Sequence, residues 1–112
     1  MNDRLTDIMG RQVRFNTLKG YDLSEPNMKM LYQMCVYMNQ EVAEVMKEIE
    51  PEWKNWKSQA KFGDIEAIRE EVVDVLHFAI NMALACGMDP DVLYDRFVRK
   101  NSVNFLRANS SY

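Results

Sequence analysis

The sequence predicts an all-α fold, and three observations support that prediction. Glycine and proline are scarce, at 4 and 3 of 112 residues. Apolar residues recur at spacings of three and four along two long stretches, which is the period of a helix with one buried face. We find no segment that alternates apolar and polar residues as a half-buried strand does. We therefore expect a single domain over residues 1–112, built as a compact bundle of four helices, two of them long and central.

The first two helices are expected over residues 3–18 and 25–49. Ser24 is predicted to cap the second helix, because Pro26 follows in what would be its first turn. Pro51 is predicted to end this helix, because proline lacks the N–H that continues the helical hydrogen bonds. The apolar stripe of the second helix comprises Leu31, Met34, Cys35, Met38, Val42, Val45 and Ile49.

The last two helices are marked by residues that favour helix ends. Asp64 is predicted to cap a helix over residues 65–86, and Gly87 is predicted to stop it. A further helix is expected to begin at Asp89-Pro90 and to continue towards the C-terminus. The apolar stripe of the third helix comprises Ile65, Ile68, Val72, Leu76, Ala79 and Ala83.

Charge and cysteine content restrict the class of protein. The chain has 14 basic and 17 acidic residues, a net charge of −3, which argues against binding a nucleic-acid polymer through a broad basic face. No apolar run reaches the ~18 residues that a membrane span needs, and the first ten residues lack the apolar core of a secretion signal. Cys35 and Cys86 lie far apart, with no zinc or disulfide pattern. We expect a cytoplasmic protein without a membrane partner.

Each long helix carries two carboxylates three residues apart, Glu41 with Glu44 and Glu71 with Asp74. Residues at this spacing share one helical face, and apolar residues flank both pairs. If the helices pack antiparallel, the four acids converge, and their repulsion and lost hydration require compensation. Mg²⁺ prefers oxygen ligands, and two such ions can activate a water and clamp a phosphoryl group. The pattern therefore favours a magnesium site for phosphate chemistry.

The residues leave a plainer interpretation open, in which these acids form ordinary solvated helix faces. Glu48, on the face of the first pair, is then surface charge and otherwise a further ligand. His77, one turn past the second pair, is either a hydrogen-bonded core residue or a group that orients a carboxylate. The candidate counter-charges are Lys47, Lys54 and Arg69.

Several motifs together resemble one superfamily, the all-α nucleoside triphosphate pyrophosphatases. This superfamily includes MazG-like proteins, phosphoribosyl-ATP pyrophosphohydrolase, dCTP pyrophosphatase and the dimeric dUTPases. The resemblance covers most of the chain, from about residue 24 to residue 107, and its later motifs are most similar to the dimeric dUTPase branch. Those motifs are Glu41-x-x-Glu44, Glu71-x-x-Asp74, Asp74-Val-Leu-His77-Phe78, Tyr94 and Lys100-Asn101-x-x-Asn104-x-x-Arg107.

The resemblance implies an enzyme that hydrolyses a nucleoside triphosphate to the monophosphate and pyrophosphate. The best expected substrate is dUTP, and the alternative is a MazG-like hydrolase of another deoxynucleotide, including a purine such as dGTP. A phage or bacterial source suits a chain of this length. Glu44 is the first choice for the acid that orients the attacking water. Two or more Mg²⁺ ions, which Mn²⁺ could replace, would be held by Glu41, Glu44, Glu71 and Asp74.

The resemblance also suggests groups that bind the nucleotide. Lys100 and Arg107 would neutralise phosphate charge, while amides would contact sugar or phosphate oxygens. Gln12 and Asn16 could read a base edge, because their amides both donate and accept hydrogen bonds. Aromatic residues of the 50–63 connection could stack on the base or serve as buried anchors. The remaining candidates are Asn101 and Asn104 for the sugar and phosphates, and Trp56, with Trp53 and Phe62 beside it, for the base.

The second helix is apolar on more than one face, which predicts a homodimer or homotetramer with sites near the subunit interfaces. A core position within one chain is the open alternative for its methionines. Two other classes of protein stay open. A carboxylate-bridged di-iron protein would need Glu-x-x-His motifs, and the chain has one histidine. A helical dimerisation or adaptor module would have no activity. The methionines concerned are Met28, Met30, Met34 and Met38.

Overall fold

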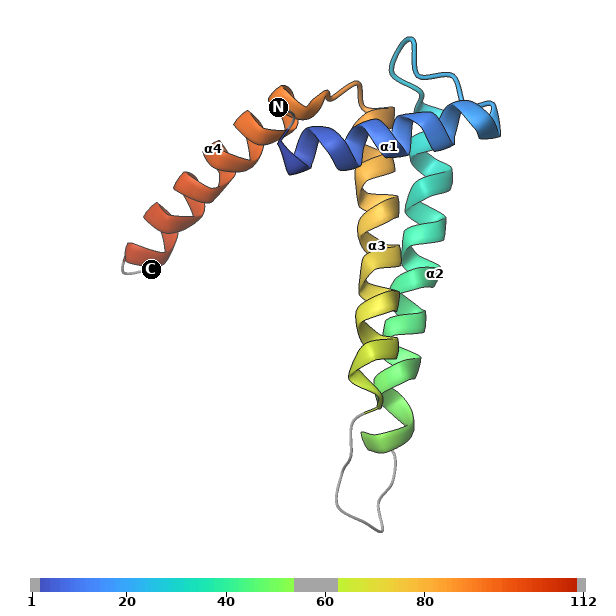
Figure 1. The fold of residues 1–112 in the computed structure, drawn as a ribbon. Coiled ribbons are helices and arrows are strands. Elements are labelled where there is room, and N and C mark those ends of the chain that lie inside the picture. The colour runs from blue at the N-terminus through green and yellow to red at the C-terminus, as the bar shows by residue number, and fades with distance from the viewer. Residues whose placement is uncertain (1–2, 54–62, 111–112) are drawn as a thin grey trace.

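The computed structural model describes residues 3–53 and 63–110, which form four α-helices and no strand (Figure 1). The all-α class predicted from the sequence is confirmed. The helices are α1 (Arg4–Lys19), α2 (Met28–Trp53), α3 (Ile65–Ala85) and α4 (Pro90–Asn109).

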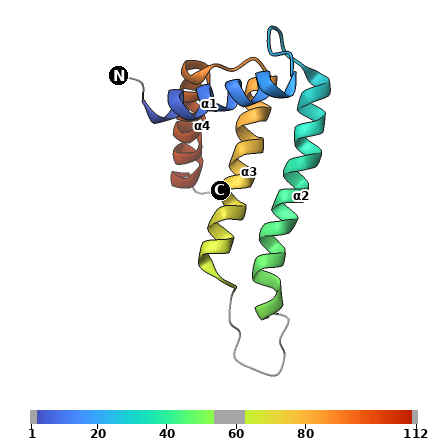
Figure 2. The ribbon, with the colours of Figure 1, turned by 45° about the vertical axis from the view of Figure 1, so that its right-hand side comes forward.

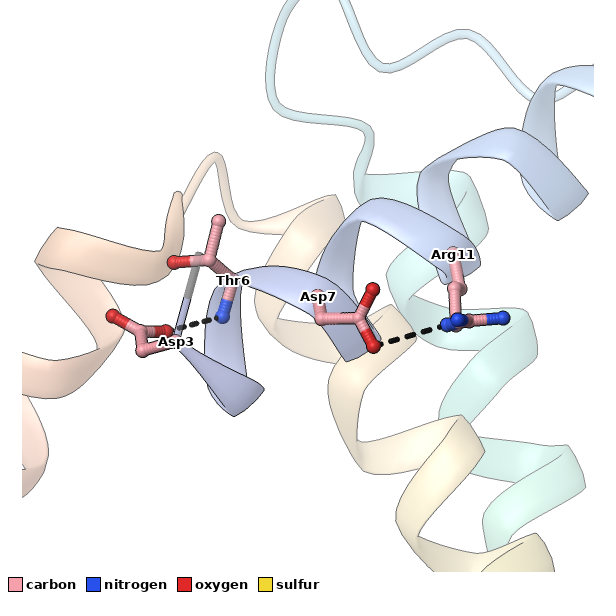
Figure 3. Close-up of polar contacts among 4 residues, drawn as sticks. All are labelled: Asp3, Thr6, Asp7 and Arg11. Atoms are coloured by element: carbon pink, nitrogen blue, oxygen red, sulfur yellow. Dashed lines mark hydrogen bonds and ion pairs between the residues drawn. The ribbon is translucent and has the colours of Figure 1, made fainter. Parts of the chain in front are cut away.

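Local chemistry fixes most of the helix ends. Asp3 caps α1 by accepting a hydrogen bond from the Thr6 backbone N–H at 2.7 Å (Figure 3). Asp64 and Asp89 cap α3 and α4 in the same way, as predicted from the sequence. Gly87, which follows α3, has a φ of 80°, a left-handed conformation that favours glycine. The predicted starts of α3 and α4 are therefore confirmed, and α3 ends at Ala85, one residue before its predicted end.

The predicted ends of α2 are wrong by a few residues. The helix begins at Met28, because the Asn27 side chain accepts from the Met30 backbone N–H at 3.0 Å and acts as the cap. Ser24 instead donates its hydroxyl to Asp22 within the preceding turn, at 2.7 Å. At the other end, α2 continues through Pro51 to Trp53. A proline so close to a helix end removes only one helical hydrogen bond, which explains why the helix does not stop there.

The apolar stripe predicted for α3 is only partly buried. Ile65, Val72 and Leu76 are 55%, 50% and 51% exposed. Helix α3 has a second face at helical spacing, and that face is the half-buried one. Periodicity shows that both faces exist, but it cannot show which one packs within the chain. The half-buried face comprises Ile68, Glu71, Val75, Phe78 and Met82.

Helices α2 and α3 form a long antiparallel pair, and α1 crosses it near the end where α2 begins (Figures 1 and 2). The core lies at this crossing, where Met30, Met34 and Ala85 pack together. Two of the four methionines expected to need a partner therefore belong to the core of the chain itself. Met9 is buried on α1, while Met28 is 58% exposed.

Helix α4 leaves the α2–α3 pair and runs away from it (Figure 1). It packs on α1, and none of its residues is buried. Among the described residues, no single helix has the length and apolarity needed to cross a membrane. Only α3 and α4 taken together, with a bend of 106° between them, reach the composition of a span.

Candidate metal and nucleotide site

Three carboxylates from the two long helices meet midway along the α2–α3 pair. Glu41 comes from α2, and Glu71 and Asp74 come from α3; one oxygen from each lies within 4.8 Å of the others. The antiparallel packing of the helices brings these acids to one level, because residues three apart on α3 share a face. All three donors are carboxylate oxygens, which is the ligand type that Mg²⁺ or Mn²⁺ prefers. The donor set therefore fits a hard divalent cation.

The pKa of Glu71 reflects its partial burial and the repulsion among these neighbouring carboxylates. Partial burial, and then the neighbouring charges of Asp74 and Glu41, raise the pKa of Glu71 above its ordinary value. Glu44 and Glu48 contribute further in the same direction. Five carboxylates thus influence one another around Glu71, and a divalent cation would relieve their repulsion.

Glu44 and Glu48 lie at the edge of the three-acid cluster. Glu44 is exposed, and its carboxylate is 3.8 Å from the Lys47 ammonium. Glu48 is half-buried on α2. Of the four acids predicted to hold metal, the structure therefore brings three within coordinating distance of one another. Glu44 is near enough for its charge to affect Glu71.

A cavity of about 380 Å³ lies next to the carboxylate cluster, between α1 and α3. Its walls are two helical faces of the same period, each with residues at i, i+3, i+4 and i+7. Asp74 belongs to both the cavity and the carboxylate cluster. The volume is in the range that holds small ligands. The lining residues are Ile8, Arg11, Gln12 and Phe15 from α1, and Asp74, His77, Phe78 and Asn81 from α3.

Hydrogen bonds join the polar residues of this cavity to the interior. The Gln12 side-chain carbonyl lies 3.0 Å from His77 Nδ1. The Gln12 amide donates to Asn16 Oδ1 at 3.3 Å, and the Asn16 amide donates to Asn81 Oδ1 at 2.9 Å. Gln12 and His77 line the cavity, while Asn16 is fully buried behind them. The structure thus places Gln12 where it can meet a ligand and Asn16 where it supports Gln12.

Four of the cavity residues were not singled out from the sequence. The signal that could have found them is the helical spacing that continues from Gln12 and from Asp74. Phe78 also contacts Tyr37 of α2, with ring centroids 5.8 Å apart. Arg11 is the cation of the cavity and pairs with Asp7 at 3.1 Å (Figure 3). The four residues are Ile8, Arg11, Phe15 and Asn81, whereas Phe78 was named only as part of the Asp74–Phe78 motif.

The predicted binding residues of α4 are not brought to the cluster within the described part of the chain. The candidates on α4 are all exposed, and Figure 1 shows that helix diverging from the α2–α3 pair. Trp56 and Phe62 lie outside the described residues, and Trp53 is described only as the last residue of α2. The α4 candidates are Lys100, Asn101, Asn104 and Arg107.

The four-helix fold is consistent with the MazG-like class of all-α nucleoside triphosphate pyrophosphatases. A family model described as dUTPase matches residues 4–92, which is most of the chain, and the chain belongs to this family. A dCTP pyrophosphatase of Enterobacteria phage T4 is 30% identical over 77 residues, covering 59% of this chain and 45% of that protein.

A dCTP pyrophosphatase of Enterobacteria phage LZ5 matches with the same identity and the same coverage. The chain thus spans about half the length of these curated relatives. No solved structure matches significantly.

Proposed function

We propose that this protein is a Mg²⁺-dependent pyrophosphohydrolase that converts a nucleoside triphosphate to the monophosphate and pyrophosphate. The observation that carries the proposal is that Asp74 belongs both to the carboxylate cluster and to the adjoining cavity. A base in the cavity would then place its phosphates beside the acids. The family description favours dUTP as the substrate, whereas the names of the two phage relatives favour dCTP. Another deoxynucleotide, including a purine such as dGTP, is the remaining alternative.

The residues divide the chemistry between them. Glu41, Glu71 and Asp74 would hold the metal, which would neutralise phosphate charge and acidify a water when bound. Glu44, close by and exposed, would orient that water and accept its proton. The water oxygen bonds to the α-phosphorus, the bond to the bridging oxygen breaks, and pyrophosphate leaves. The aromatic walls of the cavity would exclude bulk water from the base, and Arg11 adds a positive charge.

We further propose that the functional unit is a homodimer or homotetramer. The surface area of the chain is 9061 Å², whereas a compact monomer of 13.2 kDa exposes roughly 6,400 Å². The excess is larger than the ~800 Å² that each partner buries in a standard interface. A partner could also bring the cationic α4 residues to the acids, which one chain leaves apart. The exposed apolar residues include Ile65, Val72, Val73, Leu76, Phe97 and Phe105.

The test is a pyrophosphate-release assay with Mg²⁺ across deoxynucleoside and ribonucleoside triphosphates. We expect release from dUTP or dCTP, and a loss of at least roughly 100-fold in Glu71→Gln, because a metal site is sensitive to the loss of one carboxylate. Glu70→Gln is the matched control, since Glu70 is the exposed neighbour of Glu71. Absence of release from every nucleotide, or an equal loss in Glu70→Gln, would contradict the proposal.

The same protein samples distinguish an enzyme from an adaptor module. A pyrophosphohydrolase is stabilised jointly by Mg²⁺ and a bound nucleotide, because both bind only the folded state. An adaptor whose acids are surface charge would show no change in melting temperature with either ligand.

A further inference from the structure

The cavity is backed by a chain of hydrogen bonds that ends on a sulfur atom. This series of hydrogen bonds links His77 to Gln12, Gln12 to Asn16, and Asn16 to Asn81. The Asn81 amide then donates to the Met34 Sδ of α2 at 3.6 Å. Asn81 and Met34 are 5% and 2% exposed, so water has little access to the sulfur end of this series of hydrogen bonds. Three helices therefore contribute to one polar path beneath the cavity.

The sulfur determines which way each amide points. A thioether sulfur accepts a hydrogen bond but cannot donate one. Asn81 must therefore turn its NH₂ group to Met34, which leaves its carbonyl oxygen facing Asn16. Asn16 in turn directs its own NH₂ group to Asn81. Its oxygen then faces Gln12, and every hydrogen bond of the path donates in the same direction.

The common direction of donation also determines which nitrogen of His77, at the cavity wall, carries a hydrogen. Gln12 gives its NH₂ group to Asn16, so its carbonyl oxygen faces His77 Nδ1. A ring nitrogen beside a carbonyl oxygen must carry a hydrogen. Neutral His77 is therefore protonated on Nδ1, and its Nε2 holds a lone pair. Among the described residues, His77 Nε2 has no hydrogen-bond partner, which leaves it available to a ligand.

We propose that Asn81 is a positioning residue whose hydrogen-bond path fixes His77 as the Nδ1–H tautomer, so that the cavity accepts a hydrogen bond from a nucleobase N–H at His77 Nε2. The identity of the ligand as a nucleobase rests on the proposed function, but the tautomer does not. The donor would be a ring N–H or an exocyclic amine of the base. Asn81 acts on His77 through Asn16 and Gln12.

Nuclear magnetic resonance of the ligand-free protein tests the proposal directly, because the chain has a single histidine. A long-range ¹H–¹⁵N correlation at about pH 8, where an ordinary histidine is neutral, reports which ring nitrogen is protonated. We expect Nδ1–H to dominate in the wild type. Asn81→Leu should shift His77 towards Nε2–H, the form that a histidine side chain prefers in water. Asn81→Asp keeps an oxygen facing Asn16 and should retain Nδ1–H, and Asn109→Leu on exposed α4 should change nothing.

A wild-type spectrum dominated by Nε2–H would overturn the proposal, as would an unchanged tautomer in a folded Asn81→Leu variant. If that variant does not fold, Met34→Leu takes its place, because it removes the acceptor that orients Asn81 with little change in volume and should also shift His77 towards Nε2–H. The spectra need neither nucleotide nor metal, so a protein without pyrophosphatase activity would leave this result intact. Where activity is present, Asn81→Leu should raise KM for the preferred nucleotide by roughly tenfold and leave kcat nearly unchanged. An equal loss in kcat would count against a positioning role.

Discussion

Glu71, a candidate metal ligand, also affects the stability of the protein through its raised pKa. Burial and the surrounding carboxylates raise its pKa above the ordinary 4.5, so the folded chain holds this proton more tightly than the unfolded chain does. Between 4.5 and the raised value, the folded state therefore binds more protons than the unfolded state. The free energy of unfolding falls as the pH rises through that window, because the newly formed charge is less favourable in the folded state.

This reasoning predicts an unusual result for a carboxylate variant. Without metal, Glu71→Gln should be more stable than the wild type at pH 7, and the difference should shrink at pH 4, where Glu71 is largely protonated. Urea unfolding in the presence of a chelator measures this difference, with Glu70→Gln as the control. Added Mg²⁺ should reverse the order, because it stabilises the wild type more. A wild type that is the more stable form at pH 7 without metal would contradict the prediction.

Some side-chain contacts of the candidate site follow from the sequence, and others do not. Two acids three apart on one helix necessarily share a face, so their pairing was predictable. The contact between Gln12 and His77 depends on the crossing of α1 over α3, which no local pattern specifies. The exposed ion pair of Glu44 with Lys47 was likewise foreseen only as an alternative.

At the scale of the helices, the ends were predictable where one residue controls them. Asp64 and Asp89 cap within three residues of themselves, so their effect is visible in the sequence. Asn27 took the capping role from Ser24 because Asp22 already engages the Ser24 hydroxyl. The packing face of α3 was not predictable, since both of its faces are apolar and tertiary packing chooses between them.

The turn between α3 and α4 yields a prediction from backbone conformation. Gly87→Ala should destabilise the protein by about 1–2 kcal/mol, because a Cβ is unfavourable in the left-handed region where its φ of 80° lies. Gly10→Ala is a control with the opposite expected sign. Gly10 lies inside α1, where a Cβ would meet only the end of the Arg14 side chain, at 3.8 Å. The free energy of unfolding should therefore rise by about 0.5–1 kcal/mol. Urea midpoints measure both effects. Equal destabilisation by the two substitutions would contradict this view of the turn.

The described part of the molecule is open, because among its four helices only α2 and α3 pack along most of their length. Helix α4 presents its apolar residues to solvent, and so does the outer face of α3. The predicted all-α class describes the helices correctly, but the interior that one chain builds is small. The sequence predicts more apolar surface than one chain can bury, but it does not indicate which helix exposes that surface.

Association should therefore be sensitive to the outer face of α3. We expect the full chain to sediment as a dimer or tetramer, and Leu76→Glu to weaken association by at least roughly tenfold, because it places a charge in an apolar interface. Thr17→Glu, at an exposed polar position of α1, is the control. A wild type that stays monomeric at every protein concentration, or an equal effect of both substitutions, would contradict the proposed interface.

Helix α1 provides one wall of the cavity, yet few of its own side chains hold it in place. Its buried residues are Met9, Gln12 and Asn16, so two of its three anchors are amides. Local opening of such a helix costs less free energy than unfolding the α2–α3 pair. A molecule filling the cavity would add contacts on the face that α1 turns towards α3. Substrate would then complete the packing of the domain, and release of product would return α1 to its looser attachment.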